Sequence, residues 1–132
     1  MKKKLLFAAI LVLAILCLAG CSIKYASHYS ALMLITTNTP SRAGISFSSF
    51  DGTKSFRFNC KTPGTLLKYS GKLDDGSVTV SIDTDGTERE LFSLSSKQET
   101  ASTTALNATG PVYIIVRSNG KAKEGSFSFE LQ

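Results

Sequence analysis

The sequence of 132 residues has no tryptophan, one histidine and three cysteines, and each scarcity excludes a class of site. His28 has no second histidine to share a zinc ion with, and it lies in a polar stretch away from any obvious nucleophile. Without tryptophan, the aromatic platforms common in sugar-binding sandwiches could come only from tyrosines, which are Tyr25, Tyr29, Tyr69 and Tyr113. We therefore expect no enzyme, no metal centre and no cofactor.

No apolar run in the sequence is long enough for a permanent membrane span. The longest, residues 5–19, contains 15 residues without a charge, and as a helix it would reach about 22 Å of the roughly 30 Å hydrocarbon core. It follows three lysines, Lys2, Lys3 and Lys4. A positive start followed by a short apolar run is typical of an export signal.

The sequence Leu-Ala-Gly-Cys at 18–21 resembles the lipobox of bacterial lipoproteins. The resemblance implies cleavage between Gly20 and Cys21 and attachment of lipid, such as palmitate, to Cys21. A thiol is needed to take the diacylglyceryl group, and small preceding residues admit the peptidase. We therefore predict a signal peptide at 1–20, a lipidated cysteine and tether at 21–30, and a membrane-anchored protein of the bacterial cell envelope that faces away from the cytoplasm. The type of envelope stays open.

Cysteine use leaves no intramolecular disulfide in the mature chain, because Cys17 is removed with the signal and Cys21 is lipidated. The remaining Cys60 shares a period of two with Phe56 and Phe58. This pattern predicts a small buried hydrophobe rather than a reactive thiol.

The charge of the mature chain is close to neutral. Removal of residues 1–20 leaves 12 Lys and Arg against 10 Asp and Glu, which excludes a strongly basic nucleic-acid binder. The charged side chains in residues 54–72 are all basic, whereas residues 74–90 contain six acidic side chains and one arginine. These segments form either two patches for charged envelope polymers or solvated faces with cross-strand pairs, and we expect the second arrangement.

Turn signals at intervals of about ten residues indicate an all-β fold, and no window shows a sustained 3.6-residue period. The turn dipeptides are Asp51-Gly52, Pro63-Gly64, Asp75-Gly76, Asp85-Gly86 and Asn119-Gly120. They predict a small antiparallel β-sandwich, jelly-roll-like, of about seven to nine strands over residues 31–132.

Several strands can be placed within this domain. A two-residue turn at Asp75-Gly76 would pair Leu73 with Val78 and align six apolar residues on one face, Leu67, Tyr69, Leu73, Val78, Val80 and Ile82. At Asp85-Gly86 the same geometry would bury Arg89, so a longer loop or a bulge is expected there. Residues 112–116 read as a central strand. Residues 125–131 read as the last strand, with Phe127 and Phe129 inward.

The segment 83–88 has some features of a calcium loop. Asp83 and Asp85 precede Gly86, but position 92 is Phe92 where an EF-hand needs glutamate, which excludes an EF-hand. A weaker calcium site formed by Asp83, Asp85 and Glu88 stays open beside an ordinary turn.

Residues 45–131 resemble the small jelly-roll-like sandwiches of the pre-peptidase C-terminal type. The similarity lies in an aromatic strand at 54–58, a strand at 76–80, a Gly-x-x-Tyr strand at 110–116 and an aromatic last strand at 125–129. Such domains are usually non-catalytic, and the fold by itself transfers no function.

These observations predict a lipid-anchored, non-catalytic envelope protein that acts as a binding or interaction module for a protein or a glycan. The alternative is a small inhibitor or immunity-type lipoprotein. Tyr25 and Tyr29 either rest at the membrane interface or cover an edge of the domain, and we expect the second.

Overall fold

The computed structural model describes residues 25–107 and 109–132. The predicted signal 1–20, the cleavage site at Gly20 and the lipidation site at Cys21 therefore lie outside the described residues. Within them no helix is long and apolar enough to cross a membrane. The predicted all-β fold is confirmed, with nine antiparallel strands: β1 (His28–Leu32), β2 (Ile35–Asn38), β3 (Arg42–Cys60), β4 (Thr65–Asp75), β5 (Ser77–Asp83), β6 (Glu88–Ser95), β7 (Gln98–Leu106), β8 (Gly110–Ser118) and β9 (Ala122–Leu131).

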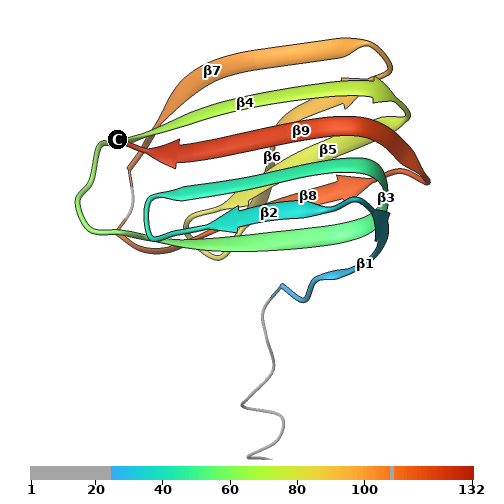
Figure 1. The fold of residues 1–132 in the computed structure, drawn as a ribbon. Coiled ribbons are helices and arrows are strands. Elements are labelled where there is room, and N and C mark those ends of the chain that lie inside the picture. The colour runs from blue at the N-terminus through green and yellow to red at the C-terminus, as the bar shows by residue number, and fades with distance from the viewer. Residues whose placement is uncertain (1–24, 108) are drawn as a thin grey trace, which may run out of the picture.

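The strands form two layers that share β3. The front layer in Figure 1 holds the first half of β3 followed by β9, β4 and β7, and the back layer holds the second half of β3 followed by β8, β5 and β6. The predicted turn at Asp51-Gly52 is wrong, because β3 runs through it without ending. Gly52 has a φ of 135°, which is open to glycine but strained for other residues, and the strand changes layers there.

Strands β1 and β2 lie along the edge of β3 that β8 and β9 leave free. His28 of β1 pairs with Thr53 of β3, and Ile35 of β2 pairs with Ser46 of β3. The predicted boundary between tether and domain at residue 31 therefore falls inside β1. The folded part begins earlier because residues 28–30 complete hydrogen bonds that the edge of β3 would otherwise leave to solvent.

The predicted hairpin at Asp75-Gly76 is wrong. Strand β4 pairs with β7 and β9, whereas β5 pairs with β6 and β8, so this corner joins one layer to the other. All six apolar residues still face inward, because the inner sides of both layers meet in one core. The alternation therefore predicted the buried side correctly but could not name the partner strand.

The remaining local predictions are confirmed. β5 and β6 pair across residues 84–87 with a bulge between Val80 and Ser81, and Arg89 is exposed. β8 lies between β3 and β5 as a central strand. Cys60 is buried, and its thiol donates to the carbonyl of Thr62 at 3.4 Å. The core contains five fully buried phenylalanines, which are Phe50, Phe56, Phe58, Phe127 and Phe129.

Candidate binding surface

The outer side of the front layer is built from the residues that alternate with the core. In β9, Phe127 and Phe129 point inward, so Ser126, Ser128 and Glu130 point out. In β4, Leu67 and Leu73 are buried, whereas the alternate residues between them, Lys68, Ser70 and Lys72, are exposed. Apart from Leu66 on β4, the outward residues of these strands are therefore polar over this stretch.

The strand register places small side chains in one row across this layer. Gly44 of β3 pairs with Ser128 of β9, which pairs with Ser70 of β4, which pairs with Ala101 of β7. The two neighbouring rows contain longer, charged side chains. One contains Arg42, Glu130, Lys68 and Thr103, and the other contains Ser46, Ser126, Lys72 and Glu99.

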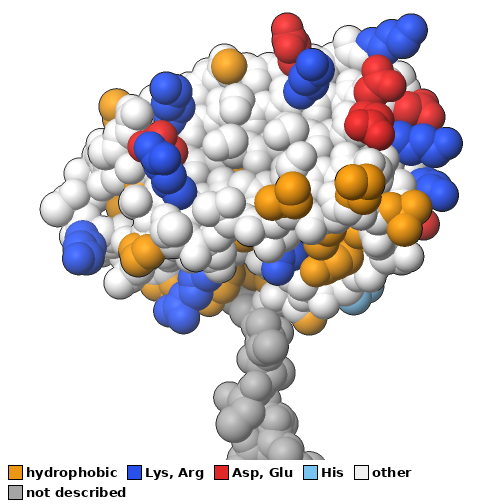
Figure 2. Space-filling view, viewed as in Figure 1, with side chains coloured by type: hydrophobic (Ala, Val, Ile, Leu, Met, Phe, Trp, Pro, Cys, Tyr) orange, Lys and Arg blue, Asp and Glu red, His pale blue; other side chains and the backbone are white. Residues whose placement is uncertain are grey.

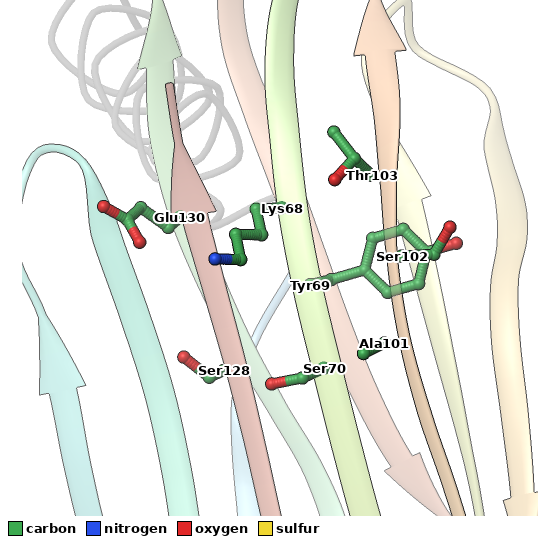
Figure 3. Close-up of a pocket in the computed structure, with 8 residues that line it drawn as sticks. All are labelled: Lys68, Tyr69, Ser70, Ala101, Ser102, Thr103, Ser128 and Glu130. Atoms are coloured by element: carbon green, nitrogen blue, oxygen red, sulfur yellow. The ribbon is translucent and has the colours of Figure 1, made fainter.

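A shallow hollow of about 490 Å³ lies over this arrangement. It is lined by eight residues, of which we call six the polar trough: Lys68, Ser70, Ala101, Thr103, Ser128 and Glu130. The other two are Tyr69 and Ser102, which are opposite each other in β4 and β7. Figure 3 shows the Lys68 side chain reaching over β9 on the side where Glu130 lies, with Ser70 and Ser128 next to each other. A second hollow shares Ser70 and Ala101 with the first, and a third shares Lys72 and Ser126 with the second and reaches Asp74. Together they extend the trough along β4 and β9 for about 20 Å.

Both signs of charge border the polar trough. Glu130 accepts a hydrogen bond from Arg42 at 3.1 Å and is paired in register with Lys68 on its other side. Lys72 is likewise opposite Glu99. Both lysines therefore have an acidic residue opposite them in the strand register. Figure 2 shows charged side chains at the two ends of this side of the molecule and an uncharged zone between them.

A second polar cluster fixes the start of the described chain to the back layer. The Tyr25 hydroxyl donates to Asp83 at 2.5 Å, and the Tyr25 ring lies 5.2 Å from the ring of Tyr113. Asp83 is only 1% exposed and also accepts the amide of Gly86 at 2.7 Å. The prediction that Tyr25 covers part of the domain is therefore confirmed.

The carboxylates proposed for calcium serve other bonds. Asp83 holds Tyr25 and Gly86, Asp85 accepts the amide of Thr87 at 3.0 Å, and Glu88 forms an ion pair with Arg117. The guanidinium of Arg117 lowers the pKa of Glu88. Within residues 25–107 and 109–132, no group of three acidic, histidine or cysteine side chains could hold a metal ion.

Replacement of Tyr25 by phenylalanine should remove one late step from the alkaline titration of the protein. The pKa of Tyr25 is raised from 10.0 to about 12, mainly by the hydrogen bond to Asp83 and secondly by burial. The folded state thus holds this proton more tightly than the unfolded state, and the stability that results is complete below pH 10 and lost as pH rises toward 12. Difference absorbance of tyrosinate between wild type and Tyr25→Phe measures the midpoint. A difference curve centred near pH 10 would contradict the assignment.

His28 and Cys60, the two residues that a catalytic cysteine–histidine pair would need, are far apart. His28 is in register with Thr53, seven residues along β3 from the buried Cys60, which is about 23 Å in a strand. Sequence patterns did not reveal the Tyr25–Asp83 contact, the Glu88–Arg117 ion pair or the polar trough. The alternation did show that Ser126 and Ser128 would point outward, which was the one signal of the trough.

In comparisons by sequence, no protein-family pattern and no curated protein matches the chain. Among solved structures, the chain resembles the module TmCBM61 in complex with β-1,4-galactotriose, at 15% identity over 80% of this chain and 87% of that one, with a TM-score of 0.52. It also aligns with an Aeromonas hydrophila periplasmic inhibitor of g-type lysozyme, at 13% identity over 83% and 93% of the two chains, with a TM-score of 0.43. The likeness to TmCBM61 shows a shared β-sandwich fold.

Proposed function

We propose that the protein is a lipid-anchored, non-catalytic module of the bacterial cell envelope that binds a glycan in the polar trough. The observation that supports a glycan ligand is the set of side chains in the trough. They offer hydroxyls and charges of both signs over a floor of small residues. The anchor is supported by the sequence at 18–21, with Cys21 as the lipidated residue.

The trough suits a hydroxyl-rich chain better than a protein partner. Protein interfaces depend on a few apolar or aromatic anchors at their centre. Between Lys68 and Lys72 the outward side chains of β4 and β9 are serines, and the nearest outward residue of β7 is Ala101. Sugar hydroxyls both donate and accept hydrogen bonds, so they can use the cations and the carboxylates together.

The mixture of charges also bears on which glycan binds. Lys68 and Lys72 are opposite Glu130 and Glu99, so the trough has no excess of positive charge to hold a polyanion. We therefore favour a neutral glycan. TmCBM61, which shares this fold, was solved in complex with β-1,4-galactotriose. Neutral β-linked oligosaccharides are therefore a suitable first set of probes.

Substitutions in the trough should weaken glycan binding by at least tenfold. Lys68→Ala removes a charged hydrogen-bond donor, contributing about 1.5–3 kcal/mol, and Ser70→Gln fills the floor. Affinities are measured by titration calorimetry with β-1,4-galactotriose and with N-acetylglucosamine oligomers, and by co-sedimentation with purified peptidoglycan. The matched control is Lys121→Ala, which removes an exposed lysine from the loop between β8 and β9.

Equal binding by the trough variants and the control would overturn the trough as the site. Failure of all three probes to bind, together with tight inhibition of a wall-degrading enzyme by the wild-type protein, would instead support the inhibitor alternative.

A further inference from the structure

Exposed apolar side chains are concentrated in one short segment. Five large apolar residues of the described chain are exposed, and four of them lie between residues 29 and 35. We call three of these the apolar ridge: Leu32 (63% exposed), Met33 (81%) and Ile35 (68%). Figure 2 shows orange side chains gathered over the part of the surface that Figure 1 labels β1 and β2.

The backbone presents the ridge to solvent while its neighbours anchor it. Ala31 and Leu34 pack against the core, so the segment is held on both sides of Met33. Met33 has a φ of 52°, a left-handed conformation that is unfavourable for a side chain of this kind and that interrupts the alternation of the strand. The side chains of Leu32 and Met33 are therefore both exposed to solvent, although they are neighbours in the chain.

The ridge belongs to the segment that leads to Cys21. Tyr25 is fixed to the domain by Asp83 and Tyr113, and only three residues lie between it and Cys21, so the two are at most about 14 Å apart. From there β1 and β2 run along one edge of β3. Lipid attached to Cys21 would therefore hold this edge of the sandwich close to the bilayer.

Neighbouring side chains suit the interface between lipid and water. Tyr29 is 43% exposed beside the ridge, with a ring and a polar tip that membrane interfaces favour. The Lys54 amine lies 6.0 Å from the centre of the Tyr29 ring, where it would meet lipid phosphates.

We propose that the apolar ridge inserts into the surface of the bilayer that holds the acyl chains of Cys21. This inference rests on the lipid anchor of the proposed function. The domain then lies on the membrane with its β1–β2 edge down, and its acyl chains and its own side chains share the attachment. The polar trough stays accessible in this orientation, because β9 and β4 lie further from that edge than β2.

A single introduced tryptophan tests the contact without background, since the sequence contains none. Acylated Met33→Trp protein is reconstituted into phosphatidylcholine–phosphatidylglycerol vesicles with and without brominated acyl chains. We expect the fluorescence of residue 33 to fall at least twofold in brominated vesicles and its emission to shift to shorter wavelength. Leu66→Trp is the matched control, because Leu66 is the other large exposed apolar residue, 42% exposed on β4, and should show no quenching.

Unquenched fluorescence from vesicle-bound Met33→Trp protein would overturn the ridge as a membrane contact and leave the anchor intact. A blue shift that depends on protein density but not on bromine would assign the ridge to a second copy of the chain, which also overturns it. Mass spectrometry of the same sample reports the acyl chains directly. Their absence would overturn the lipid anchor and the ridge together.

Discussion

Phe129→Ala is expected to cost about 3–5 kcal/mol of the free energy of unfolding and to lower the melting temperature by more than about 10 °C. Phe129 is fully buried in β9, and its ring lies 6.5 Å from that of Phe56 and 6.4 Å from that of Phe92. Those rings belong to β3 and β6 of the opposite layer. The substitution therefore opens a cavity where the two layers meet. Urea titration followed by circular dichroism measures the loss.

Two further variants make this result interpretable. Ser128→Ala, the adjacent outward position, should change stability by less than about 0.5 kcal/mol because no core contact is removed. Phe129→Leu keeps most of the volume and should lose less than Phe129→Ala, which secures a measurement if the alanine variant does not fold. Equal stability of Phe129→Ala and wild type would mean that the layers do not pack through this ring.

Cys21→Ser is expected to abolish lipidation and signal cleavage together. The diacylglyceryl group attaches through a thioether, and serine has no thiol to form one. One acyl chain binds a membrane only reversibly, whereas two or three hold a protein stably, so the proposed lipid anchor of the mature protein depends on this residue. Mass spectrometry of the expressed protein should show an unprocessed chain of 132 residues with no acyl mass.

Cys17→Ser provides the control within the same signal. It changes the same side chain inside the apolar run and should mature normally with lipid attached to Cys21. Normal maturation of Cys21→Ser, with the mass shift of the wild type, would contradict the lipobox assignment. Fractionation alone would not serve, because an uncleaved precursor keeps its apolar segment of residues 5–19.

For several strands, the sequence alone predicted which side is buried. The period-two pattern placed Phe56, Phe58 and Cys60 in the core and directed Ser126 and Ser128 outward, and the structure agrees. This works because backbone pleating and the burial of apolar area act locally, residue by residue. The spacing of the turn signals predicted the all-β class and about seven to nine strands, a range that includes the nine observed.

The partners of those strands were decided only by the tertiary structure. Asp75-Gly76 looks like a hairpin turn, yet it joins the two layers, and Asp51-Gly52 looks like a turn, yet β3 continues through it. Either arrangement buries the same side chains, so alternation cannot distinguish them. The polar trough exists because β9 lies between β3 and β4, and the Tyr25–Asp83 bond spans 58 residues of sequence. Such contacts depend on how two layers close around a shared core, which is a property of the whole chain.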